Sequence, residues 1–167
     1  MIERTLILLK PDALQRGITG EIITRFERAG LKIVGVKMLS PTREHYHKHY
    51  EDISKMITRR GQKAFDVTLD FMMSGPVIAV VLEGVQAVSL VRKMVGATEP
   101  KEAQPGTIRG DYAHISFEYA NEKGTSIPNL IHASGDSDEA KLEVPLWFNE
   151  DELLDYQLAH ESHIRGN

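Results

Sequence analysis

The run Val77-Ile78-Ala79-Val80-Val81-Leu82 is the most strand-like stretch of the chain, and the rest of the sheet is expected to form around it. Residues that interrupt regular structure flank this run: Ser74-Gly75-Pro76 precedes it and Glu83-Gly84 follows it. A short apolar run between such breakers is typical of a strand. The residues that follow, 85–95, have helical spacing, so a helix is predicted directly after this strand.

Two more strands and a helix are predicted on the N-terminal side of this run. Thr5 to Leu9 is a compact apolar run that stops at Lys10-Pro11-Asp12, which indicates a buried strand followed by a turn. Residues 20–30 place apolar side chains on one helical face and end on a glycine. Residues 32–39 alternate in the manner of a half-buried strand. The first part of the chain therefore predicts a β-α-β unit.

The remaining segments are less regular. Residues 43–50 (REHYHKHY) are polar almost all round, so they are expected to form a helix on the surface. Helical spacing continues over 51–73 with one interruption by a glycine, which indicates two helices. Alternating apolar residues over 115–119 predict a hairpin that leads into a strand over 127–132.

A last helix is predicted between Asp136, which can cap it, and Trp147-Phe148. With crossover helices between the strands, the economical topology is an α/β (α+β) fold of the ferredoxin-like type. We expect an antiparallel four-stranded sheet with helices packed on one face. The 167 residues fit one domain, 1–167, and show no internal repeat or linker.

Composition excludes several classes of protein. Hydrophobic residues make up 41% and charged residues 26%, which is the balance of a globular protein. The formal net charge of −4 argues against a general binder of nucleic acid, and the absence of cysteine excludes disulfides and thiolate metal sites. The apolar run near the N-terminus is too short for a signal peptide, and no segment has the length needed to span a membrane. The cytoplasm is the expected location.

The stretch Asn129-Leu130-Ile131-His132-Ala133-Ser134 contains the strongest candidate for chemistry. Its histidine ends a short apolar run, and Glu143 follows eleven positions later within a helical pattern. A neutral imidazole offers the lone pair of one ring nitrogen as a nucleophile, and a carboxylate on the other nitrogen would fix the tautomer and stabilise the developing charge. A histidine in such a place is also compatible with a purely structural role.

Phosphate recognition by a glycine-rich loop is excluded, because the chain has neither G-x-x-x-x-G-K-[ST] nor a G-x-G-x-x-G after a strand. Side chains would have to hold any phosphate. The candidates at predicted strand ends and in the breaker-rich loop 96–110 are Lys10, Arg92, Thr98 and Arg109. Together with Asn129 and His132, they supply the fixed positive charges and donors that phosphoryl transfer needs around a nucleophile.

Several segments carry a resemblance to a known family. They are ERTLILLKPDALQRG (3–17), SGPVIAVVLEG (74–84), RKMVGATEPKEAQPGTIRGD (92–111) and the stretch from Asn129 to Phe148. These segments resemble nucleoside diphosphate kinase, and the N-x-x-H and GTIRGD motifs stand in the order of that family. The resemblance implies transfer of the γ-phosphoryl group from a nucleoside triphosphate, typically ATP, to a nucleoside diphosphate by a ping-pong route.

The resemblance also implies roles for individual residues. His132 matches the residue that becomes phosphohistidine, and Glu143 matches its orienting carboxylate. Positions that contact the phosphates or sugar of the nucleotide, or assist transfer, are matched by Lys10, Tyr50, Arg92, Thr98, Arg109 and Asn129. The family further implies Mg²⁺ held largely by the phosphates, and a homo-hexamer or homo-tetramer; no membrane partner and no specific nucleic acid are expected.

The chain departs from the family where the base is expected to bind. The segments between Tyr50 and Ser74 and between Asp111 and Asn129 are longer than in the family, and the position of the expected stacking aromatic is Ala64. Two side chains could take the place of the missing aromatic: either Phe65 stacks on the base, or the guanidinium of a neighbouring arginine does. The candidate arginines are Arg59 and Arg60. A solvated helix tip that touches nothing is the third alternative.

Other interpretations remain open. A nucleotide-binding scaffold without turnover would be expected to lose the nucleophile or the basic residues, and this chain keeps both. A ferredoxin-like nucleic-acid binder is disfavoured by the acidic net charge and by the lack of interleaved aromatic and basic residues on the predicted strands. The alternating His45, His47 and His49 are interpreted as a solvated face rather than a metal site.

Overall fold

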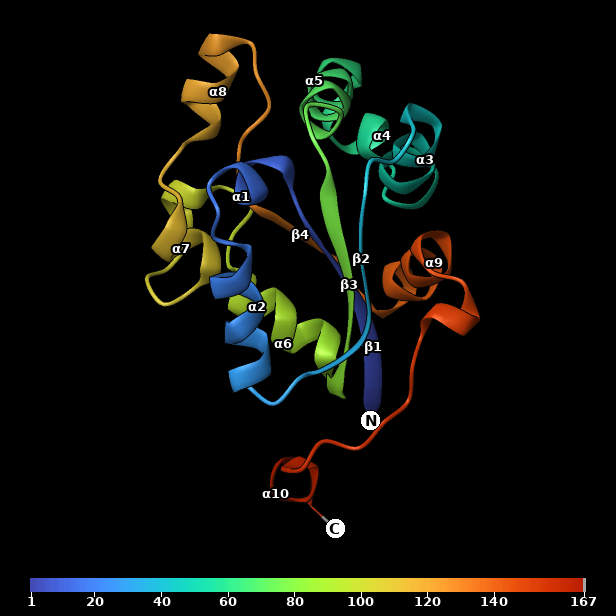
Figure 1. Ribbon diagram of the computed structural model, residues 1–167. Helices are drawn as coiled ribbons and strands as arrows, with labels where there is room; N and C mark the ends of the chain where they lie inside the picture. The colour runs from blue at the N-terminus through green and yellow to red at the C-terminus, as the bar shows by residue number, and fades with distance from the viewer. Residues whose placement is uncertain (167) are drawn as a thin grey trace.

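A four-stranded antiparallel sheet forms the centre of the molecule (Figure 1). The computed structural model describes residues 1–166, without the side chain of Arg165. The strands are β1 (Ile2–Leu9), β2 (Lys32–Leu39), β3 (Val77–Val85) and β4 (Ile131–Ala133), in the order β2-β3-β1-β4 with every neighbouring pair antiparallel. The predicted ferredoxin-like α/β fold is confirmed.

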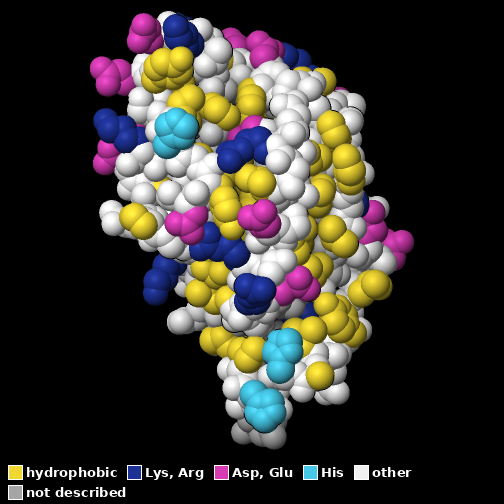
Figure 2. Space-filling model, turned by 60° about the vertical axis from the view of Figure 1, so that its left-hand side comes forward, with side chains coloured by type: hydrophobic (Ala, Val, Ile, Leu, Met, Phe, Trp, Pro, Cys, Tyr) yellow, Lys and Arg dark blue, Asp and Glu magenta, His cyan; other side chains and the backbone are white. Residues whose placement is uncertain are grey.

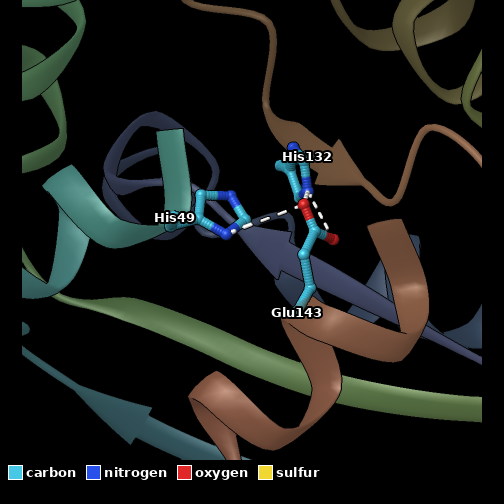
Figure 3. Close-up of side chains that lie close together, drawn as sticks. All are labelled: His49, His132 and Glu143. Atoms are coloured by element: carbon cyan, nitrogen blue, oxygen red, sulfur yellow. Dashed lines mark hydrogen bonds and ion pairs between the residues drawn. The ribbon is translucent and has the colours of Figure 1, made fainter. Parts of the chain in front are cut away.

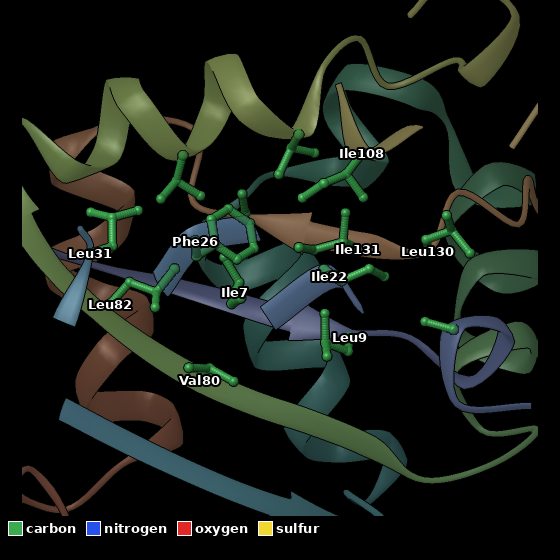
Figure 4. Packing of buried hydrophobic residues seen from close by; sticks show 14 of the residues in the cluster. Ile7, Leu9, Ile22, Phe26, Leu31, Val80, Leu82, Ile108, Leu130 and Ile131 are labelled. Carbon is green, nitrogen blue, oxygen red and sulfur yellow. The ribbon is translucent and has the colours of Figure 1, made fainter. Parts of the chain in front are cut away.

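Helices cover both faces of this sheet, so the expectation of helices on one face is wrong. On one face Ile7 and Leu9 of β1 pack against α2 (Thr19–Arg28), α6 (Ala87–Val95) and α7 (Ile108–Tyr112), as Figure 4 shows. On the other face Leu6 and Leu8 pack against the rings and aliphatic side chains of α3 (Arg43–His47), α5 (Gln62–Met72) and α9 (Ser137–Trp147). Successive residues of a strand point to opposite faces, so a continuously apolar run signals a sheet buried on both sides.

Shorter elements connect these layers. They are α1 (Pro11–Gln15), a π-helix (Lys48–Ile53), α4 (Met56–Arg60), a 3₁₀ turn (Pro100–Glu102), α8 (Phe117–Lys123), a second 3₁₀ turn (Glu150–Glu152) and α10 (Glu161–Arg165). None of the helices in the described part of the chain has the length and apolar character needed to cross a bilayer.

The segment 43–50, predicted as a helix on the surface, has one exposed face and one buried face. Tyr46, His49 and Tyr50 are buried, and Tyr46 packs with the ring of Trp147 in the core beneath α9. Spacings of three and four residues place these side chains on one helical face. The apparent polarity of the segment was misleading because tyrosine and histidine rings bury readily once their polar atoms lie at the edge of a core.

The segment 115–132 contains a helix where a hairpin was predicted. Ser116 caps α8, because its Oγ accepts a hydrogen bond from the backbone N–H of Tyr119 at 3.1 Å. Gly124 ends the helix with a φ of +65°, a left-handed conformation that favours glycine. Only Ile131–Ala133 pairs as a strand, beside Ile7–Leu9 of β1. The capping residues therefore decide that this segment is a helix, although three alternating apolar side chains favour a strand.

Candidate active site

One cleft brings most of the predicted site residues together. Its volume is about 410 Å³, in the range of small-ligand sites. Residues of α4 and α5 and of the segment after α8 contribute to its lining. Basic side chains dominate the charged part of the lining: they are Lys10, Arg59, Arg60, Arg92 and Arg109, against two carboxylates, Asp136 and Glu139.

His132 stands on β4 with its ring directed to α9. Its Nε2 lies 3.0 and 3.1 Å from the two carboxylate oxygens of Glu143 (Figure 3). A carboxylate only accepts, so Nε2 carries the proton and Nδ1 keeps its lone pair. Figure 3 shows this second nitrogen on the far side of the ring from Glu143. Because His132 also lines the cleft, the free lone pair belongs to a group that can meet a ligand.

Glu143 is fully buried and is held in its charged form by its neighbours. Burial alone would raise the pKa of this carboxyl, but the adjacent His132 and His49 and the hydroxyl of Ser134 bring the pKa down to about 2. The Ser134 Oγ lies 2.6 Å from Glu143 Oε2 and donates to it. The same hydroxyl accepts from the backbone N–H of Leu6 at 3.2 Å, which ties the carboxylate to the centre of the sheet.

His49 is a member of this cluster that the sequence analysis placed on a solvated face. It is fully buried, and its ring lies 4.5 Å from that of His132 in an edge-to-face arrangement. The indole N–H of Trp147 donates to His49 Nδ1 at 3.2 Å, so Nε2 holds the proton. Burial, and then the neighbouring His132, lower the pKa of His49 to about 3, so this imidazole is neutral. No pattern in the sequence distinguishes it from His45 and His47.

The ligand atoms of His49, His132 and Glu143 all lie within 4.8 Å of one another, a set that could coordinate an ion. Each is already engaged: Trp147 occupies the Nδ1 of His49, and His132 and Ser134 occupy the Glu143 oxygens. The group therefore acts as a hydrogen-bonded support for His132, in which His49 Nε2 is buried without a partner among the described residues.

Lys10 and Asn129 form a second hydrogen-bonded group in the cleft. Lys10 Nζ donates to Asn129 Oδ1 at 2.7 Å, and Asn129 Nδ2 donates to the carbonyl of Thr98 at 2.8 Å. Burial, and then the charge of Arg109, lower the pKa of Lys10 to about 7. Another cation nearby and removal from water both destabilise the charged form of a lysine, so an arriving anion stabilises this ammonium strongly.

Arg109 is buried and fastens the loop 96–98 to β4. Its guanidinium donates to the backbone carbonyls of Gly96, Ala97, Asn129 and Ile131. Burial, and then the neighbouring Arg92, lower the pKa of Arg109 to about 10, so it stays charged. Arg92 on α6 is exposed and lines the cleft beside it.

Asp12 is a supporting residue that the sequence analysis missed. Its Oδ2 accepts a hydrogen bond from the backbone N–H of Leu130 at 3.0 Å. Leu130 has a φ of +71°, a strained left-handed conformation for a residue with a side chain. The buried carboxylate stabilises this turn, which directs Asn129 and His132 toward the cleft. Lys10-Pro11-Asp12 signalled only a turn, and no local pattern indicates a partner more than a hundred residues away.

Tyr50 completes the surroundings of His132. Its ring lies 6.3 Å from the His132 ring, and its hydroxyl is buried with no partner among the described residues. Burial raises the pKa of this hydroxyl well above its usual value, so the group remains a hydrogen-bond donor. An unpartnered donor on a residue that lines the cleft suits an anionic ligand.

Comparisons with known proteins agree with this geometry. A sequence profile described as nucleoside diphosphate kinase matches residues 3–153. The chain belongs to the nucleoside diphosphate kinase family. A nucleoside diphosphate kinase of Borreliella burgdorferi is 45% identical over 163 residues, which cover 96% of each chain, and one of Pyrococcus furiosus is 46% identical over 98% of this chain and 94% of the relative.

Solved structures of the family are also similar. The Borrelia burgdorferi nucleoside-diphosphate kinase with bound vanadate and ADP, described as a transition-state mimic, has a TM-score of 0.94 at 43% identity, covering 97% of this chain and 96% of that one. A Halobacterium salinarum enzyme in complex with CDP has a TM-score of 0.83 at 38% identity, covering 98% and 99%. The protein is thus a phosphotransferase that moves phosphoryl groups between nucleotides through a phosphohistidine, and the family uses a divalent cation with the nucleotide.

One predicted member of this kinase site lies elsewhere. Phe65 is only 3% exposed and packs in the core beside Leu69, with the ring of His47 at 5.4 Å. It does not line the cleft, so the expectation that Phe65 stacks on the base is wrong in this structure. Phe65 and Leu69 are four residues apart on α5 and share its buried face.

Proposed function

We propose that Nδ1 of His132 accepts the γ-phosphoryl group of a nucleoside triphosphate and passes it to a nucleoside diphosphate. The hydrogen bonds that Nε2 donates to Glu143 carry this proposal, because they leave the lone pair of Nδ1 at the basic cleft. The N–P bond forms as the bond from the γ-phosphorus to the bridging oxygen breaks, and the departing diphosphate takes the electron pair. The reverse sequence transfers the group to the second diphosphate.

Glu143 orients the ring in both half-reactions and offsets the positive charge that the ring acquires on phosphorylation. The proton on Nε2 stays between the two groups throughout, so no separate base is required. Ser134 keeps the carboxylate in place from the other side. His132, Glu143, Lys10 and Tyr50 are the residues proposed to take part in transfer.

The basic side chains are proposed to hold the phosphates. Lys10, Arg92 and Arg109 offset charge on the non-bridging oxygens, which grows as the phosphoryl group transfers. Donors for the phosphates and the sugar come from Tyr50, Thr98 and Asn129. The depressed pKa of Lys10 and the unpartnered hydroxyl of Tyr50 support this assignment, because an arriving anion would stabilise the Lys10 ammonium and would accept a hydrogen bond from the Tyr50 hydroxyl.

The divalent cation is proposed to be Mg²⁺, held largely by the phosphates. Both carboxylates of the cleft already accept hydrogen bonds: Asp136 accepts from two backbone N–H groups of α9, and Glu139 accepts from the backbone N–H of Gly135. Mg²⁺ is usually bound by substrate phosphates, waters and one or two carboxylates, which this lining can accommodate. When bound, the ion neutralises charge on the phosphate oxygens.

Residues 1–167 are proposed to act as one kinase domain in the cytoplasm, assembled as a homo-hexamer or homo-tetramer. The outer strand β2 supports assembly, because Val36 and Met38 are 57% and 63% exposed on it. The backbone N–H of Leu154 bonds the carbonyl of Val34 and covers only one end of this edge. An open, partly apolar strand edge favours pairing with another chain. The substrates are nucleoside tri- and diphosphates; no membrane or nucleic-acid partner is proposed.

Isolation of the phosphorylated protein tests the proposal. The protein is incubated with γ-labelled ATP and Mg²⁺, separated from nucleotide, and then given unlabelled CDP. We expect one labelled phosphoryl group per chain, labile in acid and stable in base, and its quantitative transfer to CDP. Label that is stable in acid, or transfer that occurs only when both nucleotides are present together, would overturn the phosphohistidine route.

A further inference from the structure

The far part of the cleft has no aromatic side chain on which a base could stack. Of the described residues that line the cleft, Tyr50 is the one with an aromatic ring other than histidine, and it lies beside His132. Phe65 faces the core. A nucleotide whose phosphates lie at the basic group around Lys10 and Arg109 would extend its base toward another part of the lining, which includes Met56, Arg60, Thr68, Ser126 and Ile127.

Planar groups in this part of the cleft come from arginine. The guanidinium of Arg59 is already engaged at its edge, because it donates to the carbonyl of Ser54 at 3.1 Å and lies 3.4 Å from a Glu139 oxygen. Arg60 has no hydrogen bond or ion pair with the described residues. Its ring contact is with Phe117 on α8, where Arg60 Cζ lies 5.5 Å from the centre of the ring, and its charge also acts on Lys10 and Arg109.

We propose that the Arg60 guanidinium, backed by the Phe117 ring, is the stacking platform for the nucleobase. Arg60 Cζ lies over the Phe117 ring, and the Arg60 side chain also lines the cleft, so the guanidinium can contact Phe117 and a ligand at the same time. Guanidinium planes stack on aromatic rings of any kind. The contact joins α4 to α8 across the mouth of the cleft, and this assignment rests on the proposed function.

The residues around this platform predict weak discrimination between bases. Thr68 Oγ1 and Ser126 Oγ lie 3.5 Å apart, close to the limit of a hydrogen bond, so both hydroxyls retain capacity to donate and to accept. A hydroxyl turns to suit an amino or a carbonyl group, and stacking recognises a face rather than an edge pattern. Purine nucleotides should gain more binding free energy from stacking than pyrimidine nucleotides, because a purine base has a larger ring face.

Equilibrium binding tests the platform. The dissociation constants of ADP and of ribose 5-diphosphate, which has no base, are measured by calorimetry for the wild type and for Arg60→Ala and Arg60→Lys. We expect both variants to bind ADP three- to tenfold more weakly, the range of one cation–π contact at a partly exposed site. Ribose 5-diphosphate should bind Arg60→Lys within twofold of the wild type, because the lysine keeps the charge and loses only the plane.

Phe117→Leu tests the second half of the platform, because leucine retains apolar bulk on α8 and lacks an aromatic face. We expect weaker ADP binding, and no further loss when Phe117→Leu is combined with Arg60→Ala, since both changes remove the same stack. Tyr119→Ala is the matched control. Lys123 lies over the Tyr119 ring at 5.5 Å on the same helix, but neither residue lines the cleft, so ADP binding should not change.

Three results would overturn the platform: equal weakening of ADP and ribose 5-diphosphate by Arg60→Lys, unchanged ADP binding in every Arg60 variant, or additive losses for Arg60 and Phe117. Circular dichroism checks that α8 remains folded in the variants. Failure of the proposed function gives a different result, namely a wild type that binds ADP but forms no acid-labile phosphoprotein.

Discussion

His132 and Arg60 line the same cleft, yet the molecule supports them in different ways. His132 stands on a strand of the sheet, and its ring bonds a fully buried carboxylate that Ser134 holds from the other side. Arg60 ends the five-residue helix α4, which has no buried residue, and its partner Phe117 belongs to α8, where only Ala120 is buried. Hydrogen bonds hold the His132 group in place, and a cation–π contact holds Arg60.

The difference matches the precision that each step demands. Covalent transfer needs the nucleophile in line with phosphorus, and small misplacements cost large factors in rate. Stacking on a base tolerates sliding and tilting of the planes. Helices with few buried contacts open at low free-energy cost, so α4 and α8 are suited to admit and release nucleotides. The comparison predicts that substitutions near His132 act on transfer and substitutions near Arg60 act on binding.

Replacement of the nucleophile should have the largest effect. His132→Ala should lower transfer by at least about four orders of magnitude, because the covalent relay is lost rather than weakened. The fold should survive, with thermal unfolding within a few degrees of the wild type, since His132 contributes little to either apolar core. Steady-state transfer from ATP to CDP measures the loss. Transfer within a hundredfold of the wild type would show that another group carries the phosphoryl.

Removal of one buried cation should come next. Lys10→Ala should lower kcat/KM by about 10²- to 10³-fold, the usual effect of losing one preorganised charge or donor at the reacting group. Arg109→Ala should cost as much and also destabilise the fold, because four backbone carbonyls lose their donor. Wild-type kcat/KM in both variants would exclude these side chains from the phosphate site.

The pH dependence of binding sharpens the assignment of Lys10. With a pKa of about 7, Lys10 in the free protein loses its proton as the pH rises through neutrality. Bound phosphate favours the ammonium form of Lys10. Above about pH 8 the phosphates of ADP no longer titrate, so the proton taken up on ADP binding goes to Lys10. The affinity for ADP should therefore fall by up to about tenfold per pH unit in this range. Calorimetry in two buffers of different ionisation enthalpy measures this proton. Lys10→Arg should abolish the uptake; equal uptake in both proteins would assign the proton to another group.

Neutralising the orienting carboxylate should have a moderate effect. Glu143→Gln can still accept from Nε2 of His132 but cannot offset its positive charge, so the rate of phosphorylation should fall about 10- to 100-fold. Ser134→Ala should cost less, because Glu143 keeps its bonds to the ring. Single-turnover phosphorylation by ATP measures both. An unchanged rate for Glu143→Gln would leave the carboxylate with only a structural role.

The two ends of the cleft also differ in how much of them could be predicted from sequence. The strands β1, β2 and β3 follow from continuous or alternating apolar runs, and the candidate phosphate residues follow from motifs with fixed order. His49 and Asp12 were not predicted to contribute, because their roles depend on partners far away in the chain, Trp147 and Leu130. Phe65 was assigned to the base because its position was compared along the chain, whereas the face of α5 that it shares with Leu69 turns it to the core.

Phe65 gives the smallest expected effect on activity and the closest contrast with Arg60. Phe65→Leu should lower the free energy of unfolding by about 1 kcal/mol, because a leucine fills most of the buried volume. It should leave the dissociation constant of ADP within twofold of the wild type, since the ring lies outside the cleft. Arg60→Ala should give the opposite pattern, with unchanged stability and weaker ADP binding, because α4 buries none of its residues. Urea unfolding and ADP calorimetry on both variants measure the two quantities side by side. If Phe65→Leu weakened ADP binding as much as Arg60→Ala, the base would depend on the α5 core after all, and the division between a rigid transfer end and a loosely held base end would fail.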